Sequence, residues 1–210
     1  MAPARAPRLS ESERALSTRK HILRVAVEHA ASVGVENIRI DDVLRDAFAS
    51  SSSLYHLFGN RAGLIDAMRV ERQRLGLIEE DPSIIANAEL ITSHEEFCDY
   101  IASHLRRAIT DPSARRRRQA RLEATVAGFE SPDVARKSAI LQSMMLGITA
   151  QLMKSAIERG LCNPDLDALG YATFFVSLSL GRFTTESAVD DERWLAVAIP
   201  AALAPLRITG

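Results

Sequence analysis

Hydrogen-bonding side chains gather in the segment 50–56, which reads SSSSLYH. Leu54, Leu57 and Phe58 recur at i, i+3 and i+4, so a helix over this segment would bury them along one face. The same helix would turn four hydrogen-bonding side chains outward: Ser51, Ser52, Tyr55 and His56. A helix with such an open face is suited to enter a DNA major groove as the second helix of a helix-turn-helix. The pattern therefore predicts contacts to DNA.

A helix-turn-helix over 38–65 would position these side chains. Its first helix has an apolar face at helical spacing, made of Ile40, Val43, Leu44 and Ala47. Serine is favoured where the second helix begins, because its hydroxyl can cap free backbone N–H groups. Gly59 and Asn60 suit the end of that helix, since both tolerate a left-handed backbone. A further helix is expected from about Arg61.

The whole chain reads as an all-α protein. Of its 210 residues, 47% are hydrophobic and only 5% aromatic, and convincing alternating runs of Val, Ile and Thr are missing. Helical periodicity and helix-stop residues predict about nine helices, the first running from Ser12 or Thr18 to Val33. We expect three parts: a flexible basic N-terminal arm over 1–17, a helix-turn-helix DNA-binding domain over 18–63, and a C-terminal helical bundle over 64–210.

Charge and motifs exclude several classes of protein. The net charge is −1, although residues 1–24 carry six basic side chains against two acidic ones, as a DNA-contacting arm or a solubilising tail would. Motifs of hydrolases, nucleotide-binding enzymes and metalloproteases are absent from the sequence, so we expect no enzyme activity, cofactor or metal. Cys98 and Cys162 are expected to be small buried apolar residues and not a disulfide. Without a long apolar segment or a signal sequence, a soluble cytoplasmic protein is expected, with no membrane contact.

Two segments resemble the TetR family of bacterial transcriptional regulators: TRKHILRVAVEHAASVGVENIRIDDV (18–43) and SSSSLYHLFGNRAGL (50–64). In that family the recognition helix ends in Leu/Ile-Tyr-x-x-Phe followed by a small, a polar and a basic residue. Leu54 to Phe58 and then Gly59, Asn60 and Arg61 match this pattern. The resemblance covers about a quarter to a third of the chain. It implies a homodimer that binds double-stranded operator DNA and a small-molecule effector.

Residue by residue, the resemblance implies specific DNA contacts. Tyr55 would contact a phosphate through its hydroxyl, His56 a phosphate or a base, and Arg61 a phosphate. The remaining candidates are Ser51, Ser52 and Ser53, for bases or phosphates, and Arg39, for a phosphate. Plainer alternatives remain open: Tyr55 packed against the first helix, Arg61 as a solvated surface residue, and at least one serine used only for capping.

The turn departs from the family's pattern. Where Ala-Gly-Val-Ser is common, this chain has Ala-Phe-Ala-Ser, and Phe48 in the place of glycine would be strained at positive φ, so a re-formed turn is one expectation. Ser51 replaces a usual basic residue, and Arg39 stands where Thr or Ser usually starts the helix. These changes represent either drift within a working domain or an altered or weakened operator preference.

The C-terminal bundle would hold the effector and the dimer interface, by the same resemblance. The pocket candidates, which also fit a plain hydrophobic core, are Phe97, Tyr100, Ile101, Leu105, Leu122, Val126, Phe129, Met144, Met145, Ile148, Leu152 and Phe175. Their apolar character would imply a lipophilic ligand, with His104, Glu123 and Gln142 as polar anchors. The interface candidates, some of which would also serve the intramolecular core, are Tyr171, Phe174, Leu178, Phe183, Trp194 and Ala198.

The strongest run of charge is Arg115 to Arg118, followed by Arg121. Such runs usually form a solvated helix face, but an anionic effector or a second nucleic-acid site would also use one. Taken together, the sequence predicts a homodimeric repressor that a small, largely apolar effector releases from its operator. The alternative is a helical ligand-binding or interaction protein whose helix-turn-helix no longer reads DNA specifically.

Overall fold

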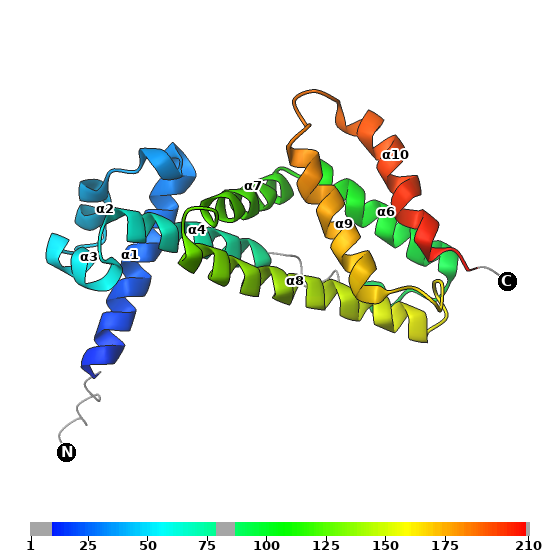
Figure 1. Cartoon of the computed structure of the whole chain (residues 1–210), viewed down its shortest axis with the longest axis horizontal. Helices are drawn as coiled ribbons and strands as arrows, with labels where there is room; N and C mark the ends of the chain where they lie inside the picture. Colours follow the sequence, from blue (N-terminus) through cyan, green and yellow to red (C-terminus); the bar gives the residue numbers. More distant parts are fainter. Residues whose placement is uncertain (1–9, 79–86, 209–210) are drawn as a thin grey trace, which may run out of the picture. The chain divides into compact units, whose positions relative to one another are not determined.

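A computed structural model describes residues 10–78 and 87–208 of the chain (Figure 1). Within these ranges the regular structure is entirely helical, which confirms the predicted all-α class. The chain forms two compact units, Met1–Arg72 and Gln73–Gly210. The boundary falls inside helix α4 (Arg61–Ile78), nine residues beyond the predicted end of the DNA-binding domain at residue 63.

The first unit contains the predicted helix-turn-helix. Its elements are α1 (Glu11–Val33), a 3-10 turn (Val35–Asn37), α2 (Ile40–Asp46), α3 (Ser51–Phe58) and the greater part of α4. One hydrophobic core joins all four helices, and its fully buried members are Ile22, Ala26, Val43, Leu64 and Met68. Leu54 of α3 is 4% exposed, so α3 is fixed by its buried face and leaves the opposite face to solvent.

The first helix begins earlier than a flexible arm over 1–17 would allow. Ser10 accepts a hydrogen bond from the Glu13 backbone N–H, and the Glu13 carboxylate accepts one from the Ser10 N–H. This reciprocal capping box satisfies free N–H groups at the helix start, so residues 11–17 are helical and the expectation of a flexible segment there is wrong. The rest of the predicted arm, residues 1–9, lies outside the described residues.

The second unit is a bundle of five long helices. They are α6 (His94–Thr110), α7 (Pro112–Ala127), α8 (Pro132–Glu158), α9 (Ala168–Phe183) and α10 (Asp191–Leu203), followed by a 3-10 turn (Ala204–Leu206). Helix α8 packs along α9, α10 along α6, and α7 on both α6 and α8. The fully buried members of this core include Phe97, Leu105, Met153, Leu195 and Leu206.

Buried polar groups fix the ends of α9 and α10. Arg182 is 2% exposed, and its guanidinium donates to the Asp191 carboxylate at 2.8 Å and to the Val189 carbonyl at 2.5 Å. Both cysteines are free; Cys162 is buried as expected, whereas Cys98 is only partly buried, and burial raises the pKa of Cys162 to about 11. Among the described residues, none of the helices is long and apolar enough to cross a membrane.

Candidate DNA interface and ligand cavity

Helix α3 begins with a serine cap that uses two of the four serines. The Ser50 hydroxyl accepts a hydrogen bond from the Ser53 backbone N–H at 3.1 Å, and the two hydroxyls lie 3.0 Å apart. Ser53 is half-buried in this arrangement, so its side chain is less accessible than those of the two serines before it, and its role in DNA contact stays a prediction. Ser51 and Ser52 are exposed in the first turn of the helix.

The open face of α3 also carries Tyr55 and His56. Tyr55 is 63% exposed, and His56 is exposed beside it. An exposure this large excludes the alternative in which the Tyr55 ring is buried against α1 within the described unit. The helix thus presents two hydroxyls, a phenol and an imidazole on one surface, as the sequence pattern predicted.

Two arginines of the same unit are also exposed. Arg39 is the N-cap residue of α2 but makes no side-chain capping bond; its side chain is 80% exposed and lies 3.7 Å from the Asp42 carboxylate. Arg61, the first residue of α4, is exposed and donates to the Glu36 carbonyl at 3.4 Å. Neither guanidinium is held in a buried ion pair, so both remain accessible to phosphate groups.

The turn between α2 and α3 keeps the backbone that a glycine would favour. Phe48 has φ of +50°, and it alone among the described non-glycine residues has positive φ. The Ala49 N–H donates to the Leu44 carbonyl at 2.9 Å, which ties the turn to the end of α2. The turn is therefore not re-formed around phenylalanine. The ring is 97% exposed, so it contributes almost nothing to the core.

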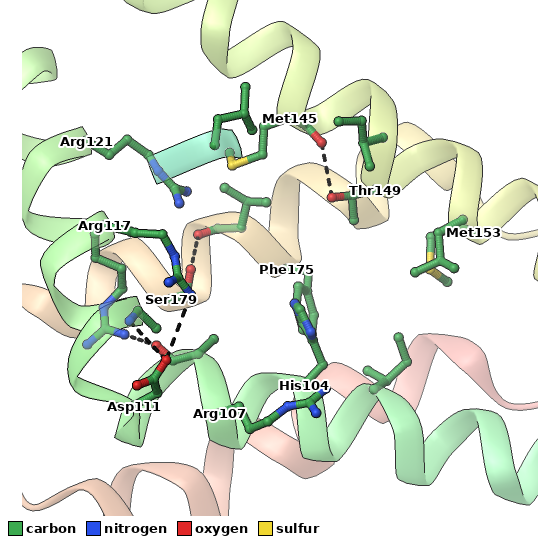
Figure 2. A pocket seen from close by; sticks show the side chains of 18 of the residues that line it. His104, Arg107, Asp111, Arg117, Arg121, Met145, Thr149, Met153, Phe175 and Ser179 are labelled. Atoms are coloured by element: carbon green, nitrogen blue, oxygen red, sulfur yellow. Dashed lines mark hydrogen bonds and ion pairs between the residues drawn. The ribbon is translucent and has the colours of Figure 1, made fainter. Parts of the chain in front are cut away.

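A cavity of about 450 Å³ lies in the second unit, among α6, α7, α8 and α9, with Leu77 of α4 at its wall. Seven of the predicted residues line it: Tyr100, Ile101, His104, Met145, Ile148, Leu152 and Phe175. Its volume is in the range of small-molecule sites. Figure 2 shows its labelled side chains, with Met145, Thr149 and Met153 on one wall and Asp111 and His104 across from them.

Other predicted pocket residues lie elsewhere. Phe97 and Met144 line a second cavity of about 560 Å³, which shares Ile148 and Leu152 with the first. Leu105 is fully buried in the core, whereas Val126 and Phe129 are 55% and 85% exposed. Leu122 lines neither cavity. For Leu122 and Val126 the reason is the orientation of α7, whose buried face consists of small alanines and one arginine: Ala114, Arg118, Ala120, Ala124 and Ala127.

Four arginines also line the cavity. Three belong to the charge run for which the sequence left an anionic effector as an alternative, and Arg107 was not predicted. Arg117, Arg118 and Arg121 of α7 and Arg107 of α6 line the 450 Å³ cavity, hereafter the arginine cavity. The first two arginines of the run 115–118 differ from the last two in their surroundings. Arg115 pairs with Glu186, and Arg116 donates to the Ser113 hydroxyl at 2.9 Å as an exposed residue. The expectation of a solvated face holds for Arg115 and Arg116 and fails for the next two arginines.

Arg118 is buried, with 3% of its surface exposed. It donates to the Ala108 and Ile109 carbonyls near the end of α6, and its guanidinium lies 3.9 Å from the Glu186 carboxylate. Its Nε has no hydrogen-bond partner among the described residues. Burial lowers the pKa of this guanidinium. A buried cation with an unused donor at a cavity wall favours an incoming anion.

His104 lies in a stack of aromatic rings at the cavity wall. Its ring centroid is 6.3 Å from that of Tyr100 and 5.8 Å from that of Phe175. Burial lowers the pKa of His104 to about 4, with the charges of Arg107 and Arg117 adding to the effect. The imidazole is therefore neutral near pH 7 and adds no positive charge to the four guanidiniums.

The predicted anchors and interface residues fall into two groups. Glu123 accepts from Gln119, and Gln142 donates to Thr125 and Ser138, so neither anchor reaches the arginine cavity. Tyr171 and Ala198 are buried in the core, and Tyr171 donates to the Ala202 carbonyl at 2.9 Å, which places both inside the bundle and not on a surface. Surface remains available at Phe174, Leu178, Phe183 and Trp194. The described residues contain no cluster of His, Cys, Asp and Glu that could hold a metal.

Several solved structures of transcriptional regulators have a similar arrangement of helices. A TetR-family regulator from Cytophaga hutchinsonii superposes with a TM-score of 0.67 at 15% identity, covering 97% of this chain and 100% of its own. A TetR regulator from Haloarcula marismortui gives 0.62 at 14% identity, covering 91% and 97%. A protein from Saccharomonospora viridis, solved in complex with choline, gives 0.61 at 16% identity, covering 90% and 96%.

Sequence comparison adds no further relative: no protein-family model and no curated protein matches the chain. At 14–16% identity the structural likeness establishes the fold. The chain has the fold of the TetR family, as the resemblance of its helix-turn-helix predicted.

Proposed function

We propose that the protein is a homodimeric, ligand-responsive DNA-binding regulator of the TetR type, acting as a repressor in the bacterial cytoplasm. The observation that carries this proposal is the open face of α3. Ser51, Ser52, Tyr55 and His56 are all exposed there, while Leu54 on the opposite face is buried. An exposed polar helix face anchored by a buried one is the geometry that reads a major groove.

Phosphate contacts would supply most of the affinity. Arg39 is an accessible cation at the N-cap of α2, Arg61 is another at the first residue of α4, and the Tyr55 hydroxyl is an accessible donor. Helix N-termini and arginines both favour phosphate oxygens. Base selection would then fall to Ser51, Ser52 and His56.

Helix α4 would couple ligand to DNA. It begins at Arg61 beside the recognition helix in sequence, and its residues from Gln73 onward belong to the second unit. Leu77 lines the arginine cavity, and a Cβ built on Gly76 would lie only 3.2 Å from Arg117 Cγ. A ligand that moves Arg117 or Leu77 would therefore move α4. The response requires a ligand that binds the two positions of α4 with different affinity.

A dimer is needed because one helix-turn-helix buries too little surface for tight specific binding. Helices α9 and α10 leave apolar and small side chains exposed, which supports their use as the interface: Leu169, Phe174, Ser177, Gly181 and Val197. Phe174 is retained from the sequence prediction, whereas Tyr171 and Ala198 are not.

The test is salt-dependent binding to the DNA upstream of the protein's own gene. A regulator should lose affinity steeply as salt rises, and Tyr55→Ala and Arg61→Ala should each weaken binding about tenfold. Arg116→Gln serves as the control, since this exposed arginine lies in the second unit. Weak binding that is indifferent to sequence and to both variants would reject the proposal and favour a ligand-binding protein that no longer reads DNA.

A further inference from the structure

We propose that the ligand of the arginine cavity is an amphipathic organic anion, with a carboxylate or phosphate head at the arginines and an apolar body along α8 and α9. This inference rests on the proposed role of the cavity as the effector site. It replaces the largely apolar effector that the sequence predicted.

The head-group site follows from the balance of charge in the wall. Four guanidiniums line the cavity, from Arg107, Arg117, Arg118 and Arg121, against one carboxylate among the lining residues, that of Asp111. Arg118 also lies 3.9 Å from the Glu186 carboxylate outside the lining, and Arg121 has an interaction partner of its own. Asp111 lies 4.0 Å from Arg117, at the limit of an ion pair, and it also caps α7 by accepting from the Ser113 and Ala114 N–H groups. Arg107 and Arg117 together carry more positive charge than Asp111 offsets, and an anion would neutralise the remainder.

The buried arginine is an independent sign of the same preference. Arg118 is held against α6 by the Ala108 and Ile109 carbonyls, so its position does not depend on a ligand. Its Nε still lacks a hydrogen-bond acceptor among the described residues, although the side chain lines the cavity and is almost fully buried. A ligand oxygen would be such an acceptor.

The opposite part of the cavity is apolar. Figure 2 shows Arg117 and Arg121 toward one side and Met153 toward the other, with Phe175 between them. Thioether, aliphatic and aromatic side chains complete the wall: Ile101, Met145, Ile148, Leu152, Met153 and Phe175. The hydroxyl of Thr149 already donates to the Met145 carbonyl of its own helix. The apolar side therefore requires no polar partner from a ligand.

The same wall argues against a cationic ligand. The protein from Saccharomonospora viridis that shares this fold was solved with choline, a quaternary ammonium ion. A cation in the arginine cavity would face four guanidiniums, with Asp111 as the one carboxylate among the lining residues. The two proteins therefore differ in ligand charge within one fold.

A head-group series with a constant tail tests the inference. The probes are decanoate, decyl phosphate, 1-decanol and decyltrimethylammonium, each below its micelle concentration, with choline and inorganic phosphate as further controls. Binding to the full-length protein is measured by calorimetry without DNA and at fixed ionic strength. We expect decanoate or decyl phosphate to bind at least tenfold more tightly than 1-decanol, and neither decyltrimethylammonium nor choline to bind.

Three variants locate the head group. Arg107→Gln and Arg117→Gln should each weaken binding of the preferred anion about tenfold, whereas Arg116→Gln should leave it unchanged because that residue does not line the cavity. Circular dichroism and thermal melting of each variant show whether it is folded. Equal binding of 1-decanol and decanoate, tight binding of the ammonium probe, or equal losses in Arg116→Gln and Arg107→Gln would each overturn the inference.

The experiments distinguish failure of the regulator proposal from failure of the inference about the ligand. If the anions bind as described but the protein does not bind its upstream DNA, the ligand class stands and the regulator proposal falls. If DNA binds specifically while none of the anionic probes binds more tightly than 1-decanol, the inference falls and the regulator proposal stands.

Discussion

Replacing Phe48 by glycine should make the protein more stable, although it removes a large apolar side chain. Phe48 holds φ of +50°, a left-handed conformation that costs an L-residue about 1–2 kcal/mol. Glycine removes that cost but gives up about 0.5–1 kcal/mol to the greater freedom of the unfolded chain. Because the ring is 97% exposed, little burial is lost. The net gain is about 0.5–1 kcal/mol, or a rise in Tm of about 1–4 °C.

Phe48→Ala separates strain from the loss of the ring. Alanine keeps the Cβ that causes the strain and lacks the ring, so its stability should stay close to that of the parent protein. Urea unfolding of all three proteins, followed by circular dichroism, gives the comparison, provided that the m-values agree. If Phe48→Gly is no more stable than Phe48→Ala, backbone strain at this turn is not a significant cost and the reasoning fails.

The same two variants test whether the Phe48 ring contacts DNA. Strain kept at an exposed position often accompanies function. If the ring contacts DNA, both variants lose operator affinity to a similar degree, since both lack the ring. Unchanged operator affinity in both variants would mean that phenylalanine at this position reflects neutral sequence drift in a domain that still binds DNA.

Three further substitutions test other parts of the structure. Arg39→Ser should add a capping bond to α2 and stabilise the protein by about 0.5–1 kcal/mol, while operator binding weakens and its salt dependence falls by about one unit of slope. For His104, the folded-state pKa of about 4 lies below the unfolded value of about 6.5, so the free energy of unfolding should fall by up to about 3 kcal/mol as pH drops from 6.5 to 4. His104→Phe should make this fall smaller when urea unfolding is measured at each pH. An unchanged dependence of stability on pH in the variant would contradict the assignment. Tyr171→Phe should cost about 1–2 kcal/mol by leaving the Ala202 carbonyl unpaired, and dimerisation measured by ultracentrifugation should persist because the hydroxyl lies inside the bundle.

Local patterns were sufficient to predict the first unit. The buried face of α3, its serine cap and its stop at Gly59 all follow from residues within one or two turns of each other. The start of α1 was also readable, since Ser10 and Glu13 have the spacing of a capping box, but residues 11–17 were assigned to a flexible arm.

The ligand cavity was harder to predict because its lining depends on how helices rotate against each other. Hydrophobicity suggested that Leu122 and Val126 of α7 point inward, yet the structure buries Ala120 and Ala124 and turns Val126 outward. Alanines at these positions allow close packing of α7 on α6 and α8, and this packing carries the neighbouring arginines to the cavity wall. The recurrence of small residues along α7 was the signal available in the sequence.

Two residues have conformations or environments that their type disfavours, and both lie in regions to which we assign a function. Phe48 holds a backbone that favours glycine, and Arg118 is a buried cation with an unused donor. Each lowers the stability of the folded protein relative to a residue that suits the position. Residues of this kind are retained where binding of a ligand or partner offsets the loss of stability. For Arg118 the offset would be an anion, since neutralising a cluster of four arginines removes mutual repulsion in addition to forming new hydrogen bonds. Anion binding should therefore raise the Tm of the protein steeply with ligand concentration, and the bundle should be least stable when its cavity is empty.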